Sequence, residues 1–201
     1  MFQPIATFIS EKYTYEDYLK LNFELNSPED VWEKAIDIFI DRINSRFFYA
    51  IDKLIENKDR YEMLKYGFAI MTLQCSLIDT FAKFRYGSNK QTERFYKFLK
   101  EYLIYNIDEK EKQKIATKFY KDIRCGLVHS GSTENMSGLS CDSLDLITTI
   151  NNGDKEFISV DIFIMDKKLR KYFEEYVKKL KNKDVELRKH FVKIMNHVCK
   201  V

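Results

Sequence analysis

The sequence predicts a mainly α-helical protein: a compact helical bundle with one inserted β-hairpin near residues 144–164. The 201-residue chain holds only 6 Gly and 2 Pro, too few for a loop-rich all-β fold. Apolar residues recur at helical spacing along most of the chain, and this period changes to 2 only near residues 144–164. The length fits one domain, and 45% hydrophobic residues suffice for a sizeable core.

The apolar period predicts six helices after an aromatic-rich N-terminal arm at residues 1–26, so the folded domain is expected to span 27–201. These helices cover about 28–56, 61–85, 91–105, 108–126, 167–181 and 184–197. Ser27 and Pro28 are typical of an N-cap and a first helical position. The second helix is apolar almost all round, which predicts a central, buried position. Gln74 and Asp79 are therefore conspicuous there, since a buried carboxylate needs a partner such as an arginine.

The segments LDLITTI and FISVDIFI alternate in hydrophobicity and flank Asn151–Asp154, a strong turn signal. They predict the hairpin at 144–164. Because a lone hairpin is marginally stable in water, we expect it to pack on the helices or pair with another chain.

Net charge is only +3, but the residues from Asp166 to Val201 hold twelve Lys and Arg against five Asp and Glu. This excess fits either the solvated face of two terminal helices or a basic surface that attracts a polyanion such as RNA.

No segment approaches the roughly 20 apolar residues of a membrane span, and the N-terminus lacks a signal-peptide pattern. Cys75, Cys125, Cys141 and Cys199 are scattered, without metal-ligand spacing. We therefore expect reduced thiols, with Cys75 in the core, in a cytoplasmic protein that uses no metal, no cofactor and no membrane.

The segment KFYKDIRCGLVHSGST (118–133) carries the candidate site. Its helix is expected to stop near Gly126, because glycine disfavours helix interiors and is common at helix ends. Arg124 and His129 are five residues apart, about 140° round an ideal helix. Both side chains suit the negative pole of a helix dipole, and Arg124 could also pair with Asp79. A catalytic pair is the other interpretation.

RCGLVH at a helix end resembles the signature of the HEPN superfamily, an Arg followed after four to six residues by His, as in a group of bacterial HEPN-like proteins. SLIDTFAKFRYG and the hairpin are similar in layout, so the bundle is expected to be HEPN-like. The resemblance implies a metal-independent endoribonuclease acting as a homodimer on RNA such as tRNA. It also implies a toxin or antiviral defence role, with an antitoxin or regulatory protein as a further partner. Many active members have Asn, Asp or His after the arginine, where this chain has Cys125.

The chemistry can be argued separately, because the 2′-OH of RNA is its own nucleophile. Histidine can act as base or acid near neutral pH, and arginine stabilises charge on the phosphate. We expect Arg124 and His129 to be catalytic, with Asp79, Ser130 and Thr133 as supporting residues. His190 and His197 fit surface or interface positions. Two alternatives remain open: a non-catalytic dimeric RNA- or protein-binding module, and a regulatory partner that docks through the hairpin or the basic C-terminal helices.

Overall fold

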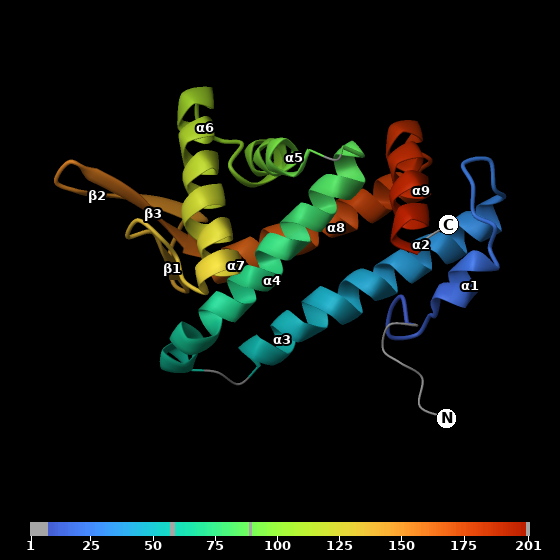
Figure 1. Ribbon diagram of the computed structural model, residues 1–201, viewed down its shortest axis with the longest axis horizontal. Coiled ribbons are helices and arrows are strands. Elements are labelled where there is room, and N and C mark those ends of the chain that lie inside the picture. Colours follow the sequence, from blue (N-terminus) through green and yellow to red (C-terminus); the bar gives the residue numbers. More distant parts are fainter. Residues whose placement is uncertain (1–7, 57–58, 89, 200–201) are drawn as a thin grey trace.

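The computed structural model describes residues 8–56, 59–88 and 90–199, which form a bundle of helices with a small sheet at one end (Figure 1). The helices are α1 (Tyr15–Leu19), α2 (Glu29–Ile43), α3 (Tyr49–Ile55), α4 (Arg60–Tyr86), α5 (Gln91–Phe98), α6 (Glu109–Lys118), α7 (Gly126–Ser130), α8 (Ile162–Lys181) and α9 (Val185–Cys199). Three π-helical turns continue α2, α5 and α6: η2 (Asn44–Phe48), η3 (Leu99–Leu103) and η4 (Phe119–Cys125). The prediction of a mainly helical fold is confirmed.

Helix α4 is the central element, as its apolar sequence predicts, and it packs against α5, α8 and α9. Aromatic rings fill the space between these helices. Phe81 of α4 stacks on Phe173 of α8 with ring centroids 5.7 Å apart, and Phe39 of α2 lies edge-on to Phe191 of α9 at 5.3 Å. The expected core position of Cys75 is also confirmed, since this residue is 1% exposed.

The N-terminal arm is attached to the bundle through polar contacts to its backbone, and its residues 1–7 lie outside the described part. Arg42 of α2 and Arg46 of η2 donate to the carbonyl oxygens of Ile9 and Phe8 at 2.8 and 2.9 Å. The prediction that Ser27 caps the start of α2 is wrong. Its hydroxyl accepts instead from the Glu24 amide at 2.9 Å, and no side chain caps the start of α2.

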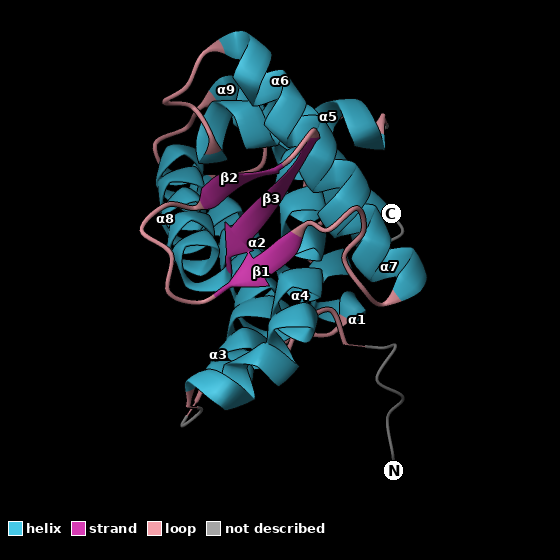
Figure 2. Ribbon diagram, turned by 90° about the vertical axis from the view of Figure 1, so that its left-hand side faces the viewer, coloured by secondary structure: helices cyan, strands magenta, loops and turns pink. Residues whose placement is uncertain are grey.

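The sheet has three strands, β1 (Gly138–Ser140), β2 (Ile147–Asn152) and β3 (Lys155–Asp161), in the order β1-β3-β2 (Figure 2). The hairpin β2–β3 confirms the predicted pairing, with Gly153 at positive φ in a two-residue turn. The parallel strand β1 is an addition that the period-2 pattern does not reveal.

The predicted hairpin extends too far, because residues 162–164 begin α8 rather than ending β3. Asp161 ends the strand by capping the helix: its carboxylate accepts from the Phe163 and Ile164 amides at 3.0 and 2.9 Å. Helix α8 therefore starts five residues before the predicted Lys167.

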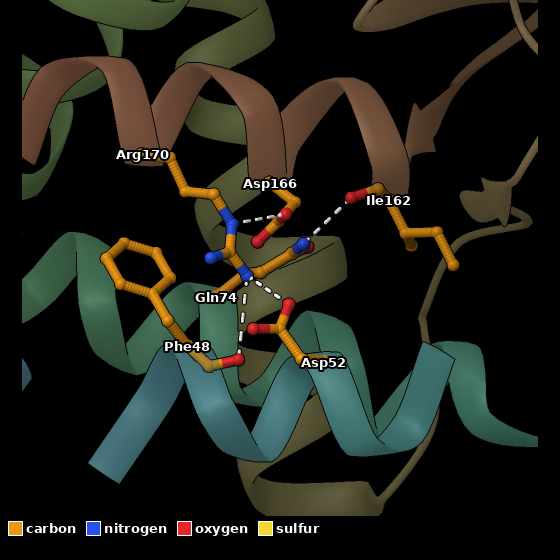
Figure 3. A network of polar contacts seen from close by, with 6 residues as sticks. All are labelled: Phe48, Asp52, Gln74, Ile162, Asp166 and Arg170. Carbon is orange, nitrogen blue, oxygen red and sulfur yellow. Dashed lines mark hydrogen bonds and ion pairs between the residues drawn. The ribbon is translucent and has the colours of Figure 1, made fainter. Parts of the chain in front are cut away.

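Gln74 and Arg170 fix the first turns of α8 against the rest of the bundle (Figure 3). The fully buried Gln74 amide of α4 donates to the Ile162 carbonyl at 2.8 Å. Arg170 binds Asp166 on its own helix at 2.7 Å and Asp52 of α3 at 2.6 Å. The conspicuous Gln74 is thus a structural link between α4 and α8.

Among the described residues, no helix combines the length and apolarity needed to cross a membrane.

Candidate functional site

Arg124 of η4 and Asp79 of α4 form an ion pair at 3.1 Å, with side chains only 15% and 16% exposed. Gln91, the first residue of α5, donates to the same Asp79 oxygen at 2.9 Å. The Arg124 guanidinium also lies 5.5 Å from the centre of the Tyr120 ring. Helices α4 and α5 and the turn η4 therefore meet at Asp79, which holds the Arg124 side chain.

The environment of Arg124 keeps its charge. Burial lowers its pKa, but the hydrogen bond and negative charge of Asp79, together with smaller contributions from Tyr120 and Cys125, raise it, and the net shift of the pKa is upward. Arg124 makes one hydrogen bond to Asp79 rather than the two-bond fork that arginine and carboxylate can form. Asp79 Oδ1 and Arg124 Nε are both buried without a hydrogen-bond partner among the described residues.

His129 lies on α7, five residues after Arg124, and is exposed to solvent. Within the described part of the chain, its side chain forms no hydrogen bond and no ion pair. It therefore contacts neither Arg124 nor Asp79 in this way. The neighbouring Val128 is apolar and 48% exposed. The structure thus brings Arg124 and Asp79 together and leaves the imidazole free to contact a molecule in solution.

The expected helix stop at Gly126 is wrong, because the helix continues to Ser130 and is capped by Gly131 at φ +64°. Gly126 has helical dihedral angles, so it is not needed for a turn. A Cβ added there would lie 2.5 Å from the Ser132 carbonyl oxygen and 3.3 Å from the Glu134 amide. Glycine at this position allows the chain after α7 to fold back against the helix.

The segment that follows α7 is anchored by Asp122 of η4, which sequence reasoning missed. This carboxylate is 4% exposed and accepts from the Asn135 amide at 2.7 Å and the Ser137 hydroxyl at 3.0 Å. The Glu134 amide donates to the Asp122 carbonyl at 2.8 Å. An acidic residue between the apolar Phe119 and Ile123 is the signal that could have identified it.

Ser130 and Thr133 take part in the same segment. The Ser130 hydroxyl donates to the Glu134 carboxylate at 3.2 Å, and the Thr133 carbonyl accepts from the Ser132 hydroxyl at 3.3 Å. Neither contact involves Arg124 or His129. A role of Ser130 and Thr133 in binding phosphate stays a prediction.

Cys125, next to Arg124, is half-buried, and Cys75 of α4 is buried with its thiol pKa raised by burial. No group of three or more His, Cys, Asp or Glu residues in the described ranges is arranged to hold a metal ion.

No protein-family model, no curated protein and no solved structure matches this chain. The relation to the HEPN superfamily therefore remains a hypothesis that rests on the motif and the helical layout.

Proposed function

We propose that the chain is a metal-independent endoribonuclease, with Arg124 and His129 as its catalytic residues. The observation that carries the proposal is the arrangement on one continuous helix. Arg124 is a charged guanidinium held by Asp79, and His129, five residues later, is an exposed imidazole without a partner in the described residues. Transesterification of RNA needs a group that transfers the 2′-OH proton and a group that stabilises charge on the phosphate, and these two residue types suit those roles.

In the proposed reaction an imidazole accepts the proton of a ribose 2′-OH, and the 2′-oxygen attacks the adjacent phosphorus. The bond from phosphorus to the 5′-oxygen breaks, and a second proton-transfer group protonates that oxygen. The products are a 2′,3′-cyclic phosphate and a 5′-OH. Arg124 stabilises the negative charge that develops on the phosphate oxygens, which a planar guanidinium fits well.

A homodimer supplies the second proton-transfer group. Each chain has three histidines, and the other two lie on α9, where His190 Nδ1 is 2.8 Å from the Arg85 carbonyl oxygen. One chain thus offers a single histidine on the η4–α7 helix that carries Arg124. Val128 and Met136, before and after His129 in the chain, are apolar and 48% and 57% exposed. A second copy that covers them would bring a second Arg124–His129 pair to the site.

The ion pair of Arg124 favours one other candidate, a non-catalytic module that binds RNA or a protein partner such as an antitoxin. In that function Asp79 holds Arg124 only to join η4 to α4, and His129 is an ordinary surface residue. The two candidates share the fold and differ in what happens to RNA.

The test is incubation of the purified protein with bulk tRNA and with single-stranded RNA in EDTA. The wild type should produce cyclic-phosphate ends, and His129→Ala and Arg124→Ala should lower the rate by at least about 100-fold. His197→Ala is the matched control, because this exposed histidine lies on α9, and it should cleave like the wild type.

Arg124→Lys separates catalysis from folding, because lysine keeps the charge beside Asp79 but lacks the planar fork. It should stay folded by circular dichroism and lose most activity. Undiminished cleavage by His129→Ala, or an inert wild type on every RNA tried, would reject the enzyme in favour of the binding module.

A further inference from the structure

A groove of about 400 Å³ lies between η3 and α8, and Tyr102, Tyr105, Lys168, Lys171 and Tyr172 form much of its wall. A narrower cleft, which Tyr102 and Tyr172 also line, continues it towards Arg85 and Lys179. None of these residues belongs to the Arg124 site, and the proposed function gives none of them a role.

The aromatic residues of the groove form a fixed platform with one accessible ring. Tyr172 is buried, and its ring lies edge-on to Tyr102 with centroids 4.7 Å apart. Tyr105, by contrast, is 51% exposed. The Lys168 ammonium lies over the Tyr105 ring, 5.0 Å from its centre, so a positive charge and an accessible aromatic surface occur together.

The basic residues follow one side of α8. Lys168, Lys171 and Lys179 are separated by three and eight residues, a spacing that places them on a common helix face. Arg85 of α4 adds a fourth cation.

Two carboxylates, Glu101 and Glu175, also line the groove. Glu101 is engaged, since it accepts from the Tyr86 hydroxyl at 2.8 Å and lies 3.8 Å from the Lys97 ammonium. The groove itself is lined by two lysines and two carboxylates, and with Arg85 and Lys179 of the narrower cleft the cations outnumber the carboxylates by four to two.

Two buried polar atoms at the groove have no hydrogen-bond partner among the described residues, the Tyr172 hydroxyl and Arg85 Nε. Burial raises the pKa of Tyr172, so this hydroxyl remains protonated and can donate. Buried donors without partners are uncommon in folded proteins. Here both belong to residues that line the same cleft.

We propose that this groove binds a segment of single-stranded RNA, with a base stacked on Tyr105 and successive phosphates along Lys168, Lys171 and Lys179. Proteins that bind single-stranded nucleic acids combine a positively charged groove for the phosphates with aromatic rings on which the bases stack. The proposal rests on the proposed function for the choice of RNA as ligand. It adds a binding site that selects single-stranded regions of the substrate.

The groove and the catalytic pair lie on different faces of α4. The Phe81 ring packs against the Tyr172 ring of the groove, with centroids 5.1 Å apart. Asp79, two residues earlier on α4, binds Arg124. Two residues correspond to about 200° of rotation round a helix. The groove therefore contacts a part of the RNA away from the scissile phosphate.

The test is fluorescence anisotropy with a labelled 2′-O-methyl oligouridine of about 12 nucleotides, within the site size of single-strand binders. This probe has no free 2′-OH and cannot be cleaved. Tyr105→Ala should weaken binding by on the order of tenfold, and Tyr105→Phe should not. Replacing Lys168 and Lys171 with Gln should lower the slope of log K against log salt by about 1.4, the value for two single-strand phosphate contacts.

The matched control replaces Lys20 and Lys34 with Gln, the same charge change at two exposed lysines at the end of α1 and on α2, outside α8 and η3. The control should keep the wild-type slope. The proposal is overturned if Tyr105→Ala binds the oligonucleotide with wild-type affinity. It is also overturned if the control lowers the slope of log K against log salt as much as the groove variant does. Displacement of the probe by uridine monophosphate at equal nucleotide concentration overturns it too, because the occupant is then a free nucleotide.

The probe also separates this proposal from the ribonuclease. His197→Ala, an exposed residue of α9 outside both proposed sites, should bind the oligonucleotide like the wild type. If RNA is cleaved but the groove variants bind normally, the groove alone is rejected. Groove-dependent binding without cleavage of any RNA rejects the enzyme and leaves the groove standing.

Discussion

Replacing Gly126 with Ala tests how closely the chain after α7 packs on the helix. The new Cβ would lie 2.5 Å from the Ser132 carbonyl oxygen and 3.2 Å from Glu134 Cγ, so residues 132–134 must move. Overpacking of this kind costs about 1–3 kcal/mol. The shift also strains the hydrogen bond from the Glu134 amide to the Asp122 carbonyl, which contributes about 1 kcal/mol. Alanine favours the helix by about 1 kcal/mol. The net expectation is a loss of about 1–3 kcal/mol.

Gly67→Ala is the matched control, because Gly67 is also a buried glycine inside a helix. Its added Cβ would meet only the Leu139 and Ile162 methyl groups, at 3.9 and 4.0 Å, which is ordinary contact. This variant should therefore gain about 1 kcal/mol from helix propensity. Urea unfolding followed by circular dichroism measures both. A Gly126→Ala protein that is as stable as the wild type would refute the close packing.

Three further predictions concern the ion pairs and the hairpin. Asp79→Asn removes the counter-charge of Arg124 and should lower the free energy of unfolding by about 1.5–3 kcal/mol in urea titrations; no change would mean that the pair is not formed. Hydrogen bonds from Arg188 lower the pKa of Glu29 to about 2, so this carboxylate stabilises the fold above its ordinary pKa of 4.5 and loses that contribution as the pH falls towards 2. Glu29→Gln should flatten the stability profile over that range, and an unchanged profile would exclude the linkage. Gly153 has φ +61° and open space around its Cα, so Gly153→Ala should cost roughly 1–2 kcal/mol through backbone strain alone; thermal melting at wild-type stability would exclude the strained turn.

The helices were predictable because their signal is local. The apolar stripe of α2 and the all-round apolar sequence of α4 report burial directly, since each turn carries its own evidence. The predicted start of the fourth helix at residue 108 has a local cause as well: the Asp108 carboxylate accepts from the amides of Lys110 and Glu111 at 3.0 and 3.2 Å.

The errors occur where the residue type at one position fits two different local structures. Asp161 fits the outward face of a strand, but its carboxylate caps α8 and turns the next three apolar residues into helix. Gly126 fits a helix end, but it lies inside the helix where residues 132–134 return. The strand β1 has only three residues and forms because β3 offers an edge.

The candidate site could be predicted in part. A carboxylate in an apolar helix needs a partner, and that argument leads from Asp79 to an arginine. Gln91 and Asp122, which complete the surroundings, carry no comparable signal. The groove along α8 was missed because its aromatic and basic residues are divided between 101–105 and 168–179. Only the packing of η3 on α8 brings them together.

The ion pair of Arg124 fits the proposed catalytic role as well as a structural one, because the two roles need the same environment. A guanidinium that stabilises a phosphate must stay charged and must be positioned before the substrate arrives. Asp79 raises the pKa of Arg124, and the single hydrogen bond at 3.1 Å uses one of five donors. A purely structural pair would gain more from a two-bond fork. The one-bond geometry leaves other N–H groups of the guanidinium without a protein partner among the described residues, and for this reason we propose Arg124 as the residue that binds the phosphate.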